Sequence, residues 1–101
     1  MKKTIIEQIE IKRDGTVQVR FQLQVIDEGE IVASAWHRTS LPPGVNVDKQ
    51  IEAVNGSLSL IGKAPVEKGC IDWLRPFVQS AHTPEAIASY QERLAEESRP
   101  A

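Results

Sequence analysis

The sequence has little of what most recognisable functional sites require. It contains one cysteine, Cys70, which excludes an intramolecular disulfide and suits a reducing compartment. No stretch approaches the roughly 20 apolar residues that a membrane-spanning helix needs. Twelve basic and fourteen acidic residues leave a net charge of -2, spread over both halves of the chain. No excess of one sign therefore predicts binding to nucleic acid or to an anionic membrane.

Motifs for catalysis and for ligand binding are missing as well. The chain has neither a Gly-x-Ser-x-Gly elbow nor a phosphate-binding glycine loop. The spacing of His37, Cys70 and His82 matches no zinc pattern, so the sequence predicts no metal site. We therefore expect no enzyme, no cofactor and a protein that stays soluble in a cytoplasm.

Alternation of apolar and polar residues predicts three antiparallel strands, over residues 4–12, 16–26 and 30–39. The middle strand alternates valine, phenylalanine and leucine with glutamine and arginine, which is typical of a strand buried on one face. In the first strand we expect Ile5, Ile9 and Ile11 to lie on the same side.

Glycine-containing turns set the register of these strands. A three-residue loop at residues 13–15 pairs Ile11 with Val17, whereas a two-residue turn would mix apolar and polar faces. Gly15 is then expected in the left-handed conformation that closes such a loop.

The second turn, residues 27–29, repeats this pattern, with Gly29 in the position of Gly15. A three-residue loop here pairs Phe21 with Ala35. The small side chain of Ala35 leaves room on the apolar face of the sheet, where we expect helices from the second half of the chain to dock.

The third strand carries the candidate interaction residues. Val32 and Trp36 stand among glutamines on the face opposite the apolar one. His37 and Arg38 follow towards the end of the strand, with His37 expected opposite Val19. An exposed tryptophan would indicate an interface, whereas local packing of Trp36 is the alternative.

Helical spacing of apolar residues predicts three helices, over residues 48–61, 72–81 and 84–96. The first is ambiguous, because Asn55-Gly56 is also a strong hairpin signal, so residues 48–62 can form a helix or a hairpin. We favour the helix, which Gly62 would end. If Asp72 caps the second helix, Pro76 falls in or near its first turn, where a proline is tolerated.

The last helix has the clearest start signal. Thr83 is suited to the N-cap, and Pro84 to the first helical position. His82, just before it, is expected to face solvent or to pack locally. Residues 97–101 are expected to be frayed. Together these patterns predict one α+β domain over residues 1–101: a β-meander in residues 1–40 and a helical part in residues 41–101.

Three segments carry a resemblance to a known family. They are the opening "IEQIEIKRDGTVQVRFQLQVIDEGEIVAS", the segment "WHRTSLPPGVNVDKQIEAVNGSL" and the helix start "HTPEAIASYQ". The chain resembles small proteins encoded among the tail genes of bacteriophages and prophages. The residues that match the family's short motifs are Trp36, His37, Arg38, Thr83, Pro84 and Glu85. His82 departs from the pattern, because the family has a tryptophan there.

The resemblance implies a tail-associated structural or assembly protein that acts by protein–protein interaction, without catalysis. Its partners would be other tail proteins or further copies of itself. It would be made in the cytoplasm of the bacterial host and then enter the virion. The alternative is a small phage-encoded inhibitor that binds a host protein.

Overall fold

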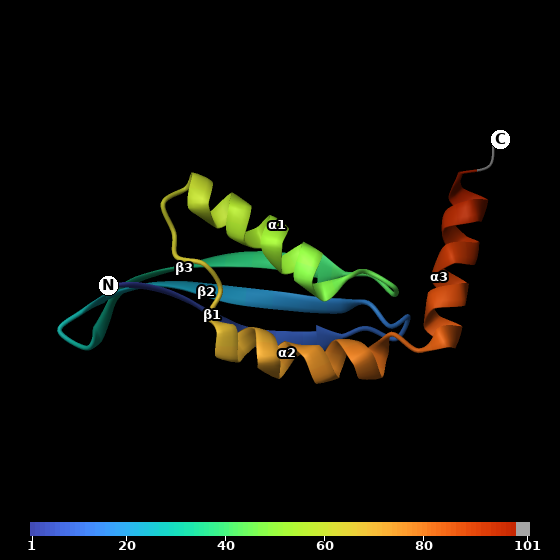
Figure 1. Ribbon diagram of the computed structural model, residues 1–101, viewed down its shortest axis with the longest axis horizontal. Helices are drawn as coiled ribbons and strands as arrows, with labels where there is room; N and C mark the ends of the chain where they lie inside the picture. The colour runs from blue at the N-terminus through green and yellow to red at the C-terminus, as the bar shows by residue number, and fades with distance from the viewer. Residues whose placement is uncertain (99–101) are drawn as a thin grey trace.

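Three strands in the first half of the chain form one antiparallel sheet in the order β1-β2-β3, with β1 at Lys2–Ile11, β2 at Val17–Asp27 and β3 at Glu30–Leu41. Three helices follow, α1 (Val47–Leu60), α2 (Lys68–Ala81) and α3 (Pro84–Glu97) (Figure 1). The computed structural model describes residues 1–98. The predicted α+β arrangement of a β-meander followed by three helices is confirmed.

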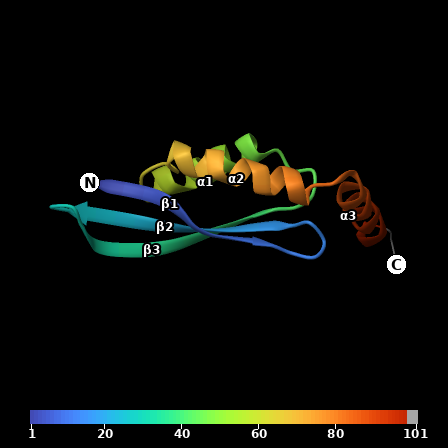
Figure 2. The same cartoon turned by 90° about the horizontal axis from the view of Figure 1, so that it is seen from below.

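The alternation in β2 places one face of the sheet in the core. Helices α1 and α2 lie over this same face (Figure 2). The core side chains from these three elements are Val17, Val19, Phe21, Leu23, Ile51, Val54, Leu58, Leu74 and Val78. Each apolar side chain buried in this layer contributes about 1.5–3 kcal/mol relative to leaving it in water. Neither α1, α2 nor α3 lies on the opposite face of the sheet.

A bulge in β1 changes which isoleucines face the core. Ile6 pairs with Phe21 and Gln8 with Arg20, which leaves Glu7 as the extra residue. Ile6 is therefore buried against the helices, whereas Ile5 lies on the other face. The expectation for Ile5 is wrong because strict alternation takes no account of an inserted residue.

The first turn has the predicted register. Ile11 lies opposite Val17, and residues 13–15 form the three-residue loop. The Gly15 N–H donates to the carbonyl of Lys12 at 3.0 Å, and Gly15 has a φ of 91°. This conformation is readily available only to glycine.

The second turn differs from the first. Asp27 pairs with Glu30, so the loop has two residues, Glu28 and Gly29, with φ of 51° and 79°. Two successive left-handed residues are typical of a type I′ turn, whose twist suits a hairpin.

The register of β3 is therefore shifted from the predicted one. A bulge between Val25 and Ile26 compensates for the shorter turn, and Val32 is the extra residue in β3. Phe21 consequently lies opposite His37 instead of Ala35. The prediction of this pairing is wrong by two residues, so the side chains beyond the bulge still lie on the predicted faces.

Residues 47–60 form a helix and Ile61 caps its end, so the helix rather than the hairpin is present in this segment. Asn46 caps α1, because its Oδ1 accepts from the Lys49 N–H at 3.0 Å. Gly62 follows the helix with a φ of 72°. The Asn55 side chain accepts from the Val66 N–H at 2.9 Å, so it holds the connector to α2 rather than forming a turn.

Helix α2 begins four residues earlier than predicted. Its start is held by β1, because the Glu67 N–H donates to the Thr4 carbonyl at 2.9 Å. Asp72 is consequently inside the helix and does not cap it, and Pro76 lies in the helix interior. An interior proline lacks one helical hydrogen bond, which the packing of the buried residues around it has to offset.

Helix α3 begins where predicted. The Thr83 hydroxyl accepts from the Ala86 N–H at 3.1 Å, and Pro84 is the first helical residue. The helix stands at one end of the sheet and has no buried residue (Figure 1). Of the residues predicted to be frayed, Glu97 is helical, and 99–101 lie outside the described residues.

Candidate protein-interaction surface

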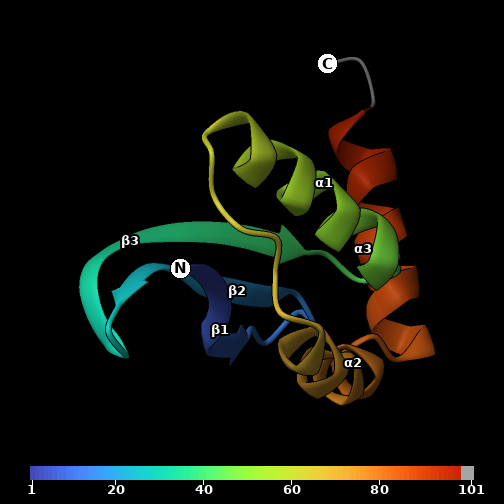
Figure 3. The ribbon, with the colours of Figure 1, turned by 60° about the vertical axis from the view of Figure 1, so that its left-hand side comes forward.

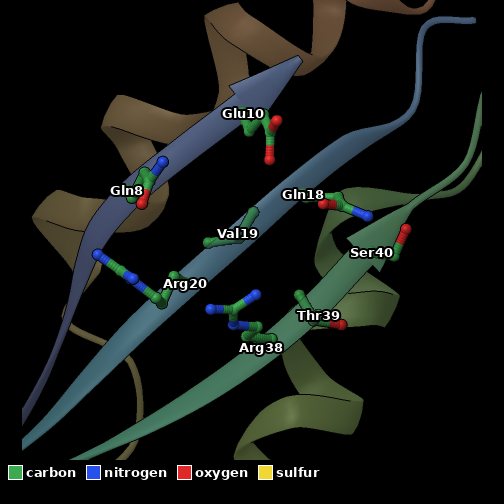
Figure 4. A pocket seen from close by; sticks show the side chains of 8 residues that line it. All are labelled: Gln8, Glu10, Gln18, Val19, Arg20, Arg38, Thr39 and Ser40. Atoms are coloured by element: carbon green, nitrogen blue, oxygen red, sulfur yellow. The ribbon is translucent and has the colours of Figure 1, made fainter. Parts of the chain in front are cut away.

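The face of the sheet that lacks a helix is mostly polar, and we call it the open face. Its central side chains are Gln18, Arg20, Gln22, Ser34, Trp36, Arg38 and Ser40. A shallow hollow of about 390 Å³ lies on it (Figure 4). The residues around the hollow are Gln8, Glu10, Gln18, Val19, Arg20, Arg38, Thr39 and Ser40. Four of these residues carry amides or hydroxyls and three are charged, so the hollow offers both hydrogen bonds and charged groups.

Arg20 fixes the position of Trp36 on the open face. Its Nε and Nη2 donate to Oε2 of Glu7 at 2.9 Å and 2.7 Å. The same guanidinium lies 4.7 Å from the centre of the Trp36 ring, a cation–π contact. Trp36 nevertheless remains 52% exposed. The indole is therefore held in place while half of its surface stays available to a partner.

The structure brings together only part of the predicted interaction set. Trp36 and Arg38 share the open face, and no ion pair joins Arg38 to an acidic residue within residues 1–98. His37 lies on the opposite face, with its ring 6.1 Å from that of Phe21. Val32 is the extra residue of the bulge and is 61% exposed.

Residues 25–36 form the end of the β2–β3 hairpin, which we call the distal hairpin. It extends past α1 and α2 at the left of Figure 1. Ile31 is 52% exposed, and the small Ala33 and Ala35 are exposed although they share a face with the core. The expected docking of a helix over these alanines is wrong, because α1 and α2 cover only the other half of the sheet.

A second exposed apolar feature escaped the sequence analysis. The rings of Trp73 and Phe77 on α2 meet edge to face at 5.7 Å, and both are more than a third exposed. Their spacing of four residues places them in a stripe beside the buried Leu74 and Val78. The four-residue spacing could have indicated an exposed aromatic pair, but the same spacing is typical of the buried face of an amphipathic helix.

His82 has a structural position. Its Nδ1 faces the Gly44 N–H at 3.4 Å, and its Nε2 lies 3.0 Å from the Leu41 carbonyl. A ring with the proton on Nε2 accepts from Gly44 and donates to Leu41. His82 therefore ties the start of α3 to the end of β3, which agrees with local packing rather than with exposure to solvent.

Cys70 is also engaged within the fold. The Ile6 N–H donates to its sulfur at 3.4 Å, and the residue is partly buried. Within residues 1–98, no three histidine, cysteine, aspartate or glutamate side chains gather as metal ligands would. Over the same residues, no helix has the length and apolar character needed to cross a membrane.

Comparison of the chain with protein-family models, with curated proteins and with solved structures gives no match. The geometry of the surface is therefore the basis for a functional proposal. Three of the exposed large apolar side chains, Ile31, Val32 and Trp36, lie close together in the distal hairpin. An arrangement of this kind suits contact with another protein.

Proposed function

We propose that this protein acts by binding other proteins, without catalysis, as a structural or assembly component of a bacteriophage tail. The observation that carries the binding role is the exposure of Ile31, Val32 and Trp36 within six residues of one strand. Single exposed apolar residues are common on soluble proteins, whereas neighbouring ones are typical of interaction sites.

The assignment to a phage tail rests on the resemblance of the three sequence segments. In this proposal the partners are other tail proteins or further copies of the chain. The protein is made in the cytoplasm of the bacterial host before it joins the virion. The polar open face suits this role, because an assembly component has to stay in solution until its partner is present.

Affinity capture from cells that carry the phage or prophage tests the proposal. We expect the tagged protein to retain tail proteins, and Val32→Ser with Trp36→Ala to reduce their recovery. Leu60→Ser is the matched control, because Leu60 is exposed but lies outside the distal hairpin. Recovery of a host protein in place of tail proteins would favour the inhibitor alternative. Equal recovery by both variants would contradict the proposed surface.

A further inference from the structure

The two outer edges of the sheet are treated differently by the fold. The edge at β1 is partly covered, because the connector that leads from α1 into α2 ends beside it (Figure 3). Thr4 bridges to Val66 in parallel, its carbonyl accepts from Glu67, and the Ile6 N–H is taken by Cys70. At β3, β2 is the only strand that pairs with it among the described residues. Apart from the contact of His82 with the Leu41 carbonyl, the outer backbone edge of β3 is therefore bare.

The composition of β3 does not protect this edge. Proteins usually blunt an exposed edge strand with lysine, proline, a β-bulge, a short length or inward-pointing charges. The strand has twelve residues and neither lysine nor proline, and no charged residue occurs from Ile31 to Trp36. Its bulge, at Val32, lies next to the turn, and the pairing with β2 is regular from Ala33 to Leu41. Residues 30–36 are exposed. A strand with these properties is a template for pairing with another strand.

The charges at the two ends of this segment are of opposite sign. The turn carries Asp27, Glu28 and Glu30, and Arg38 lies at the other end. None of these four side chains forms an ion pair with a residue in the described part of the chain. In an antiparallel pair of identical strands, the acidic end of each copy lies beside Arg38 of the other. A parallel pair would instead put like charges together.

We propose that two copies of this chain pair antiparallel through the edges of β3, over Ile31–Arg38, and form a six-stranded sheet across a two-fold axis. The inference rests on the proposed function in that it takes protein binding as the role of this surface. The open faces of the two copies are then continuous, with both Trp36 side chains on them. We expect assembly to stop at two copies, because the edges left outermost are those of β1, which are occupied at Thr4 and Ile6 and interrupted by the bulge at Glu7.

Charge reversal tests the orientation of the pair. Glu28→Lys with Glu30→Lys makes both ends of an antiparallel dimer repulsive, and Arg38→Glu does the same with the opposite sign. We expect each variant to raise the dimer dissociation constant roughly 10- to 100-fold, because cross-strand charge pairs at two symmetric ends change sign. Sedimentation or light scattering over a range of concentrations measures this constant.

An equimolar mixture of the two variants supplies the matched control. In the mixed dimer, the lysines of one chain face the carboxylate that Arg38→Glu introduces in the other, and Arg38 of the first faces the native acids of the second. Association should therefore return to the wild-type level without any further mutation. A folding defect in either variant would not be repaired by mixing, and a parallel pair would not show this pattern.

Cross-linking locates the axis. Ser34 and Ala35 lie in the middle of the segment, and in an antiparallel pair the residue on the two-fold axis lies opposite its own copy, whereas its neighbour does not. We expect one of the two variants Ser34→Cys and Ala35→Cys, made in a Cys70→Ser background, to give a disulfide-linked dimer on oxidation, and the other to cross-link poorly. Ser57→Cys on the exposed side of α1 is the control and should remain monomeric.

A wild-type protein that stays monomeric into the millimolar range would overturn the inference. So would a dimer that neither variant weakens, a mixture that fails to restore association, or growth into open-ended assemblies. These outcomes are separate from the test of the proposed function. A monomer that still captures tail proteins disproves the pairing alone, whereas a dimer that captures none disproves the tail role alone.

Discussion

The two turns of the meander have similar sequences and contrasting surroundings. At the first turn, a Cβ on Gly15 would lie 2.8 Å from the Ala81 carbonyl oxygen and 3.0 Å from the Ala86 Cβ. At the second, a Cβ on Gly29 would meet nothing within 4 Å. Both glycines have positive φ, so backbone conformation explains both of them. Only the first is also required by packing.

The difference extends to the two ends of the sheet. Near the first turn, other parts of the chain cover the end of the sheet. Helix α3 begins there, and Arg93 pairs with Asp14 at 3.2 Å. The His82 ring contacts the Gly44 N–H and the Leu41 carbonyl. The distal hairpin has no such cover from α1, α2 or α3 (Figure 1). One end of the sheet is thus covered within the chain, and the other leaves its apolar residues exposed.

Of the two turns, the first is expected to show the larger effect. Gly15→Ala places a side chain in the left-handed region and against backbone, and should lower the free energy of unfolding by about 3 kcal/mol. Gly29→Ala meets only the conformational cost and should lower it by about 1.5 kcal/mol. Denaturant unfolding of both variants measures the difference. Equal losses would mean that α3 does not pack on the first turn in solution.

A smaller loss is expected from the link at the end of β3. His82→Ala removes both ring contacts and should lower the free energy of unfolding by about 1–2 kcal/mol. It should also speed hydrogen exchange of the Gly44 amide, because that N–H loses its acceptor. His37→Ala is the comparison, since His37 has no such hydrogen bond and the Gly44 amide should keep its protection. Unchanged exchange in His82→Ala would contradict the link.

The sequence predicted most of the structure at the end of the sheet near the first turn, and less of the structure at the distal hairpin. The loop closed by Gly15 and the cap at Thr83 follow from local rules, and both are confirmed. The β3 register was wrong because a two-residue turn and a bulge at Val32 together preserve the faces. Alternation detects faces and cannot detect a shift of two residues.

Long-range contacts account for the other differences. Helix α2 starts at Lys68 because β1 holds the preceding connector, and no local pattern near Asp72 signals this. The hydrogen bonds of His82 join segments about 40 residues apart, which spacing cannot predict. His37 was expected opposite Val19, and the same shift of two residues places it opposite Phe21 on the same face.

Trp36 provides a test at the bare end. Trp36→Ala should lower the free energy of unfolding of the dilute protein by less than about 1 kcal/mol, because it loses an exposed cation–π contact with Arg20. Phe21→Ala on the covered face should cost about 3–5 kcal/mol. Chemical denaturation at low protein concentration compares the two. Similar losses for both variants would place Trp36 in the core rather than on a binding surface.

The smallest effect concerns pH and the first turn. A hydrogen bond from the Thr16 backbone N–H, with a further contribution from Arg93, lowers the pKa of Asp14 below its ordinary value of 3.8. The pKa of Asp48 is also lowered, chiefly by its hydrogen bond with Arg75. A carboxyl with a lowered pKa in the folded state stabilises the fold above its ordinary pKa. That contribution is lost as the pH falls through 3.8 to the lower folded value.

Asp14→Ala and Asp48→Ala should therefore lower the melting temperature at neutral pH, and the difference from wild type should shrink below pH 3.8. Added salt separates the two causes, because it screens an exposed ion pair far more than a hydrogen bond within a turn. The effect of Asp48→Ala should fall with salt, and that of Asp14→Ala should largely persist. If salt abolished both equally, Asp14 would act through Arg93 on α3 rather than through the turn itself.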